Sequence, residues 1–194
     1  MKDILQLKVS LHQSSPEIWR RILVDKGTTL FDLHHILQIT MGWQNYHLYE
    51  FKINKQRFGI PNDDFEDAAL IDASQVKLED VLTNDKQKFE YLYDFGDYWR
   101  HNIVYEKSLE DDGVSYYPVC TDGELSAPPE DCGGLGGYHH LIQVISSKDY
   151  PDHEDMVEWV GEEFDPNFFD KTMINEELEM LDEYIDDYLD GLND

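Results

Sequence analysis

Hydrophobic and polar residues alternate along residues 5–11, which is the period of a β-strand with one buried face. Turn-forming residues follow at positions 14–16, and residues 18–24 again read as a strand. The two segments are close in sequence and both carry strand periodicity. The pattern therefore predicts an N-terminal β-hairpin.

The period then changes to that of a helix. Thr28 or Thr29 can serve as the N-cap, apolar residues recur at helical spacing from Leu30 to Met41, and Gly42 can end the helix. This segment is predicted to be the one main helix of the N-terminal part.

Further strands are predicted by alternation at residues 47–53, 89–95 and 99–105, with a short strand near 57–60 and a short helix at 74–82. Gly96 and Asp97 are predicted to form a two-residue type II′ turn. With that turn, Asp94 would face Trp99 across the hairpin. The order of elements resembles a β-grasp sheet wrapped on one helix.

The second part of the chain has a different character. Residues 111–137 hold both cysteines and many prolines and glycines without a sustained period, which predicts a long loop. Short helices are predicted around 138–145 and 156–160. An apolar stripe from Ile174 to Leu192 predicts an amphipathic terminal helix, which either packs on its own domain or serves a partner or a second copy.

Together these patterns predict a single α+β domain over residues 1–194. Residues 1–110 would form a mixed β-sheet core with the hairpin and the main helix, residues 111–137 a Pro/Gly-rich loop, and residues 138–194 an acidic helical segment packed on the core. A chain of 194 residues that is 41% hydrophobic is long enough and apolar enough to bury such a core.

Charge is unevenly distributed along the chain. The formal net charge is −27; residues 1–110 carry 18 acidic and 13 basic side chains, and residues 111–194 carry 24 and 2. An acidic surface repels the phosphate backbone, so direct nucleic-acid binding is not expected. Three explanations stay open: solubility, docking on a basic protein partner, and mimicry of nucleic acid.

The chain contains no run of 18 apolar residues and does not begin with a basic and then apolar leader. We therefore expect a cytoplasmic protein that does not enter a membrane.

Polar side chains gather around the predicted hairpin and in the Pro/Gly-rich segment. The candidate functional cluster is Asp94, Asp97, Trp99, His101, Glu130 and Asp131. A carboxylate and an imidazole on one strand face could orient a proton-transferring histidine or bind a metal. Alternatively, the aspartates accept hydrogen bonds from turn amides and His101 is a half-buried core residue.

Cys120 and Cys132 are twelve residues apart, so they do not form the tight knuckle of a standard structural zinc site. A divalent-metal site assembled in space from His101, Cys120, Cys132 and Asp97 is chemically reasonable. Two reduced thiols and a disulfide are the alternatives.

Several motifs carry a family resemblance: Ile18-Trp19-Arg20-Arg21, Leu33-His34, Gly42-Trp43 with His47-Leu48, Tyr93-Asp94-Phe95-Gly96-Asp97 with Trp99 and His101, Tyr117-Pro118, and Pro128-Pro129-Glu130-Asp131-Cys132-Gly133-Gly134. On these motifs the chain resembles the plasmid pRiA4b ORF-3-like family from about residue 3 to about residue 170. The resemblance implies an association with plasmids and mobile elements, and it supplies no catalytic residue.

Some members of that family carry a resolvase label, which does not transfer to this chain. A serine resolvase needs an activated serine among arginines and a basic DNA-binding tail. This chain has four arginines and an acidic tail.

Three functions remain compatible with the sequence. The first is a non-enzymatic accessory or protein-interaction module, because the second half is acidic, the terminal helix is amphipathic and no catalytic motif is complete. The second is a metal-dependent hydrolase, in which His101 or a carboxylate acts as base or ligand and the cysteines act as ligands. The third is a nucleic-acid mimic formed by the acidic C-terminal region.

Overall fold

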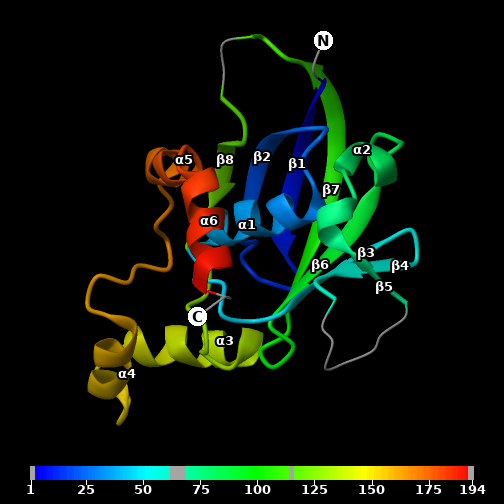
Figure 1. Ribbon diagram of the computed structural model, residues 1–194. Coiled ribbons are helices and arrows are strands. Elements are labelled where there is room, and N and C mark those ends of the chain that lie inside the picture. The colour runs from blue at the N-terminus through cyan, green and yellow to red at the C-terminus, as the bar shows by residue number, and fades with distance from the viewer. Residues whose placement is uncertain (1–2, 62–68, 114–115, 192–194) are drawn as a thin grey trace.

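The computed structural model describes residues 3–61, 69–113 and 116–191. Over these residues, eight strands form one sheet with the order β5-β4-β3-β6-β7-β1-β2-β8 (Figure 1). The strands are β1 (Asp3–Leu11), β2 (Trp19–Asp25), β3 (Tyr49–Ile53), β4 (Gln56–Gly59), β5 (Leu70–Asp72), β6 (Lys88–Tyr93), β7 (Trp99–Glu110) and β8 (Val119–Glu124). The β4/β5 pair is parallel and the others are antiparallel, so the predicted mixed sheet is confirmed.

The predicted N-terminal hairpin is present. β1 and β2 pair antiparallel with Leu7 opposite Ile22, and both of these side chains are fully buried. β1 also pairs with β7, which places the hairpin inside the sheet. Alternation identified these strands from sequence because only one of their faces is continuously buried.

The main helix is α1 (Leu30–Met41), and its ends lie where the capping residues predict. The Thr29 hydroxyl accepts a hydrogen bond from the Asp32 amide, and the Asp32 carboxylate accepts one from the Thr29 amide. Gly42 ends the helix in the left-handed conformation with φ of 70°. Local chemistry therefore determines both ends of this helix.

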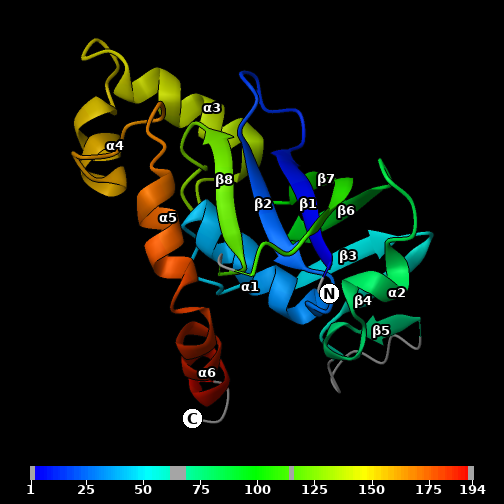
Figure 2. The ribbon, with the colours of Figure 1, turned by 90° about the horizontal axis from the view of Figure 1, so that it is seen from above.

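The remaining helices are η1 (Ala73–Gln75), α2 (Leu78–Val81), α3 (Gly134–Ile145), α4 (His153–Val160), α5 (Lys171–Leu178) and α6 (Leu181–Gly191). α5 and α6 run along the side of α1, as Figure 2 shows from above. α1 is therefore covered by the sheet on one side and by these helices on the other. That explains why every residue from Leu33 to Met41 is buried.

The terminal helix is predicted as one element and observed as two. The Asn175 side chain bonds the backbone N–H and C=O of Cys120 and so ties α5 to β8. In α6, Tyr184 and Tyr188 instead place their rings against His35 in α1. The break between Leu178 and Leu181 lets both contacts form, and the apolar stripe packs on its own chain.

The hairpin between β6 and β7 differs from the prediction by one residue. Tyr93, not Asp94, faces Trp99, and residues 94–98 form the connection. The Asp94 side chain accepts a hydrogen bond from the Gly96 amide, and the Asp94 carbonyl accepts one from the Tyr98 amide. These bonds close a wider turn, so the predicted two-residue turn and the shared face of Asp94, Trp99 and His101 are wrong.

Residues 111–137 are not a continuous loop. β8 lies within them and pairs with β2 at the sheet edge, with Cys120 opposite Ile22. Its residues do not alternate clearly because an edge strand is partly exposed on both faces.

None of the helices in the described parts of the chain combines the length and apolar character needed to cross a bilayer.

Candidate functional site

Three chain segments meet at the end of the sheet where β3 begins and β6 ends. They are residues 42–48 after α1, the connection 94–98 between β6 and β7, and residues 128–134 before α3. Figure 1 shows the β6–β7 connection beside α3. A hydrogen bond from the Asp94 amide to the Leu48 carbonyl, 3.0 Å, joins the first two segments. The third segment is held by the bond from the Gly133 amide to the Asp97 carboxylate, 3.0 Å.

Each of the three segments contributes one side chain to a small polar cluster. His47 Nε2 lies 3.3 Å from Asp131 Oδ1 and 3.8 Å from Asp94 Oδ2. The three side chains can place ligand atoms within 4.8 Å of one another, and no other such trio of His, Cys, Asp and Glu occurs in the described residues. We call His47, Asp94 and Asp131 the polar triad.

The triad is held by the backbone around it. One oxygen of Asp94 accepts the Gly96 amide at 2.8 Å, while the other is the oxygen nearest His47. The His47 ring packs edge-on against Tyr93, with ring centroids 5.8 Å apart. The carboxylate of Asp131, by contrast, is 69% exposed. The triad is therefore fixed on its inner side and open on its outer side.

The spacing and chemistry of the triad suit a divalent metal ion. His47 Nε2 is buried and makes no hydrogen bond, although two carboxylates face it. In a tetrahedral zinc site with metal–ligand distances near 2 Å, ligand atoms are about 3.4 Å apart. The His47–Asp131 separation of 3.3 Å matches this, and the His47–Asp94 separation of 3.8 Å is somewhat longer. One imidazole and two carboxylates would bind Zn²⁺ or Mn²⁺ and leave coordination positions for water or a ligand.

A second set of contacts supports the triad from behind. The Tyr93 hydroxyl donates to Glu130 Oε1 at 2.5 Å, and the Gln44 amide donates to Glu130 Oε2 at 2.7 Å. Burial, together with the bond to Glu130 and its charge, raises the pKa of Tyr93. The Trp43 indole donates to the Pro128 carbonyl at 2.8 Å. These bonds fix the backbone next to Asp131.

Gly134 allows the close approach of this segment to the β6–β7 connection. Its φ is +67°, and a Cβ atom built on it would lie 2.5 Å from the Asp97 carbonyl oxygen. Only glycine tolerates both the conformation and the contact. The glycines after Cys132 thus serve to bring Asp131 to the hairpin.

The structure divides the candidate residues inferred from sequence into three groups. Asp94 and Asp131 belong to the triad, whereas Asp97 and Glu130 hold the loops around it. Trp99 and His101 lie in the core, each 1% exposed.

His101 is enclosed within the sheet and its covering residues. Its Nδ1 lies 3.1 Å from the Trp99 carbonyl, and its ring is 5.4 Å from that of Trp43. Burial lowers the pKa of His101 to about 3, so this imidazole is neutral at pH 7. It is a core residue.

The predicted metal set of His101, Cys120, Cys132 and Asp97 does not assemble as a group of three or more ligands anywhere in the described parts of the chain. Both thiols are free, so the disulfide alternative is wrong as well. Cys120 is buried on β8, where its Sγ contacts the Asp122 carbonyl. Burial raises the pKa of both thiols, that of Cys132 to about 12, so neither is a thiolate at pH 7.

His47 belongs to the triad but is not among the candidate functional residues inferred from sequence, where it appears only in a family motif. Its alternation with Tyr49, Phe51 and Ile53 predicts a strand beginning at residue 47, but β3 begins at Tyr49. The signal that could have found it is Asn45 just before it, because asparagine tolerates the left-handed backbone conformation. Asn45 has a positive φ of 61° and turns the chain so that His47 points to the β6–β7 connection.

Exposed apolar side chains adjoin the triad residues along the chain. Tyr46 and Leu48 flank His47 in sequence, and Phe95 and Tyr98 lie in the connection that follows Asp94; these four side chains are between 49% and 72% exposed. We call them the apolar rim. Large apolar side chains grouped at the surface mark contact sites more often than isolated ones do.

A groove of about 470 Å³ adjoins the triad between α3 and α4 and shares Asp131 with it. Its other lining residues are Cys132, Gly137, His140, Leu141, Asp152, Asp155, Met156 and Trp159. Three carboxylates beside an exposed indole favour a cationic group.

Comparison with known proteins places this architecture in a family. The sequence profile described as plasmid pRiA4b ORF-3-like protein matches residues 3–173. The chain belongs to this family. The matched region contains the whole triad and ends within α5, so α6 lies beyond it.

Two relatives illustrate the family. The uncharacterized protein y4hQ of Sinorhizobium fredii is 36% identical over 160 residues, which cover 82% of this chain and 81% of that protein. The crystal structure of a protein of unknown function, MM3350 from Methanosarcina mazei Go1, superimposes with a TM-score of 0.80 at 37% identity. It covers 89% of this chain and 97% of that one. The α+β fold is thus shared with a solved structure.

Proposed function

We propose that this protein is a metal-dependent interaction module, in which one divalent ion bound by His47, Asp94 and Asp131 fixes the loops that contact a basic protein partner. The observation that carries the proposal is the convergence of these three side chains from three separate segments. A cation placed there would neutralise two facing carboxylates and coordinate His47 Nε2, which makes no hydrogen bond.

The surroundings of the triad support a role in recognition. The apolar rim offers aromatic contact area at the tips of the loops that the ion would hold. The groove beside Asp131 adds two further carboxylates, Asp152 and Asp155, and the whole protein has a net charge of −27. Charge complementarity therefore favours a basic partner over an acidic one.

The metal-binding step is tested by calorimetric titration of the full chain with ZnCl₂ and with MnCl₂. We expect one ion per chain and a loss of about 100-fold in affinity for His47→Ala, because three-ligand sites depend on each ligand. His139→Ala, which removes an exposed imidazole on α3, is the matched control. Equal affinity in His47→Ala and the wild type would disprove the site.

The recognition step is tested by cross-linking and mass spectrometry of the full chain in extract, with ZnCl₂ or with a chelator. We expect a basic protein cross-linked through the apolar rim only when zinc is present, and its loss in Tyr98→Ser. Tyr150→Ser changes another exposed tyrosine, far along the chain on the α3–α4 connection, and should have no effect. Cross-links that ignore both zinc and Tyr98 would contradict the proposal.

A second candidate, a metal-dependent hydrolase, is favoured by one feature. The triad supplies three ligands and its outer side is open, so a bound ion would keep a position for water. Hydrolysis of phosphoester or peptide substrates by the zinc- or manganese-loaded protein, abolished in His47→Ala, would support this function. Absence of turnover with an intact metal site would leave the interaction module.

A further inference from the structure

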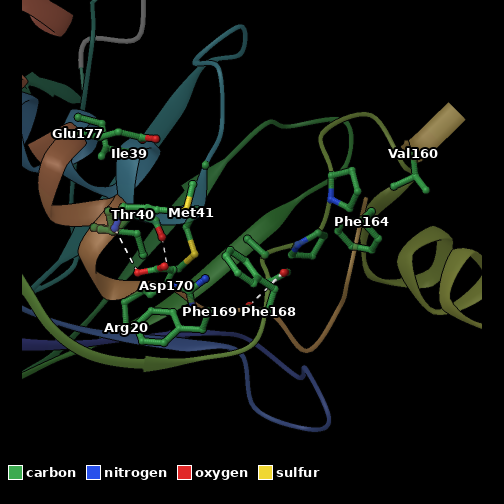
Figure 3. Close-up of a pocket in the computed structure, with 17 residues that line it drawn as sticks. Arg20, Ile39, Thr40, Met41, Val160, Phe164, Phe168, Phe169, Asp170 and Glu177 are labelled. Carbon is green, nitrogen blue, oxygen red and sulfur yellow. Dashed lines mark hydrogen bonds between the residues drawn. The ribbon is translucent and has the colours of Figure 1, made fainter. Parts of the chain in front are cut away.

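A second cavity, of about 330 Å³, lies between the C-terminal end of α1, the residues after β8 and the N-terminal half of α5 (Figure 3). Its floor includes Arg20 on β2. The figure shows Phe168 and Phe169 close to Arg20 and Val160 and Phe164 at the far side.

Arg20 is unusual because it is buried without a counter-ion. Only 3% of it is exposed. Its Nε donates to the Thr40 carbonyl at 2.9 Å, and its Nη1 donates to the carbonyls of Trp19 and Glu124 at 2.8 and 3.0 Å. Within the described residues, no carboxylate lies in ion-pair distance of Arg20 and its Nη2 makes no hydrogen bond.

A buried charge is costly unless an opposite charge compensates it. The chain has 42 acidic residues, yet none of the described ones forms an ion pair with Arg20. Arg20 is instead held by neutral carbonyls and by the ring of Phe169, 4.9 Å from the guanidinium carbon. Burial lowers the pKa of Arg20 to about 10, so it remains charged at pH 7. The charged guanidinium can therefore donate from Nη2 to an anionic group that enters the cavity.

The walls of the cavity are mainly apolar. Beside the phenylalanines they include Ile39, Met41, Val160, Met173 and Ile174. Two acidic residues, Asp170 and Glu177, also line the cavity. Asp170 accepts the Thr172 and Met173 amides as the N-cap of α5, and burial raises the pKa of Glu177. Apolar walls with one charged group at the base are typical of a small-molecule site.

We propose that this cavity binds a small apolar carboxylic acid. The carboxylate accepts hydrogen bonds from Arg20 Nη2, and the hydrocarbon part packs against Phe164, Phe168 and Met173. The volume is at the low end for ligand pockets, which suits a medium-chain or single-ring acid. The cavity shares no residue with the polar triad, so acid binding here and metal binding there are tested with different variants.

The experiment is a titration of the ¹⁵N-labelled full chain with sodium octanoate, followed by NMR on the amides and on the Arg20 Nε–H. We expect saturable shifts of the Arg20 signal and of amides around residues 168–174. Octanamide, which lacks the charge, and acetate, which lacks the chain, should each bind at least about tenfold more weakly. Binding of octanamide or acetate as strong as that of octanoate would overturn the proposal.

Two variants give the titration a structural control. Arg20→Lys keeps the charge but loses the planar donor pair, and octanoate affinity should fall about tenfold or more. Since this variant could also disturb the fold, Met173→Glu provides a second test from an exposed position on the cavity wall. It should weaken octanoate binding, whereas Met180→Glu, equally exposed outside this cavity, should not. Unchanged binding in Met173→Glu, or equal losses in both methionine variants, would contradict the site.

Discussion

Two histidine clusters in this protein use the same kinds of side chain for opposite purposes. In the interior, His34 is fully buried and both ring nitrogens are bonded, Nδ1 to the Tyr91 hydroxyl at 2.8 Å and Nε2 to Asn45 Oδ1 at 2.6 Å. At the loop end, the Nε2 of His47 makes no hydrogen bond and faces two carboxylates. The first cluster is closed and the second is open.

The closed cluster is a complete network. The Gln38 side chain donates to the Tyr91 hydroxyl at 2.9 Å, and the backbone N–H of Asn45 donates to Gln38 Oε1 at 3.1 Å. Since Asn45 Oδ1 can only accept, His34 Nε2 carries the proton and Nδ1 accepts from Tyr91. Burial lowers the pKa of His34 well below its usual range, so it stays neutral. This network ties α1 to β6 and has a structural role.

The hydrogen-bond partners of a histidine and its exposure to solvent decide whether it can bind a ligand. A neutral ring bonded on both sides has no nitrogen left for a ligand. A half-exposed ring beside carboxylates does, and its position on connecting loops lets a ligand approach.

Replacing the central residue of the closed cluster should have the largest effect. His34→Ala removes the partner of Tyr91 and of Asn45 and leaves a cavity, so the free energy of unfolding should fall by about 4 kcal/mol. Urea denaturation measures this. His139→Ala should change it by less than about 0.5 kcal/mol. A loss below about 1 kcal/mol for His34→Ala would mean that the network contributes little.

Acid should destabilise the interior through its neutral histidines. The pKa of His35 is lowered to about 4 and that of His101 to about 3, from an unfolded value of 6.5. The unfolded chain therefore binds protons first, so this stability is present above pH 6.5 and is lost as pH falls toward 4. Each histidine contributes a slope of about 1.4 kcal/mol per pH unit.

Denaturation at several pH values checks this slope with one variant. His101→Gln should remove one histidine's share, about 2.3 kcal/mol between pH 6.5 and 4.5, relative to the wild type. His140→Gln, an exposed change, should keep the wild-type slope. Identical pH profiles for the wild type and His101→Gln would show that His101 is not kept neutral by burial.

The open cluster should respond to metal and the closed one should not. At a free Zn²⁺ concentration 100 times the dissociation constant, the wild type should gain about 2.7 kcal/mol of unfolding free energy. Asp131→Asn should lose most of that gain while its metal-free stability stays within about 0.5 kcal/mol of the wild type, because its carboxylate is exposed. A gain that survives in Asp131→Asn would place the metal elsewhere.

The smallest expected effect comes from a residue that positions Asp131 without binding the metal itself. Gly134→Ala would push a methyl group against the Asp97 carbonyl at a positive φ and should cost about 1–2 kcal/mol. Because Gly134 positions the segment that carries Asp131, Zn²⁺ affinity should also fall about tenfold. Calorimetry on the folded variant measures it. Gly136→Ala, which meets no atom within 4 Å, is the control.

The sequence indicated part of the candidate site and missed the rest for a definable reason. Asp94 was a candidate because the predicted hairpin placed it on one face with His101, a placement that is wrong. Asp131 was a candidate because it precedes Cys132 in the Pro/Gly-rich segment. His101 was also a candidate. The observed hairpin register differs from the predicted one by one residue and places His101 opposite Tyr91, in the core. His47 was hidden in an apparent strand, since alternation does not reveal where pairing begins.

By itself, the sequence determined the elements whose signals are local: the β1/β2 hairpin from its alternation, α1 from its period, and the two ends of α1 from Thr29 and Gly42. Tertiary structure alone decided the β6–β7 register, the pairing of β8, the split between α5 and α6, and the meeting of His47 with Asp94 and Asp131. These depend on hydrogen bonds and packing between residues far apart in the chain. A periodic pattern reports which face of an element is buried, but it carries no information on which distant segment buries it.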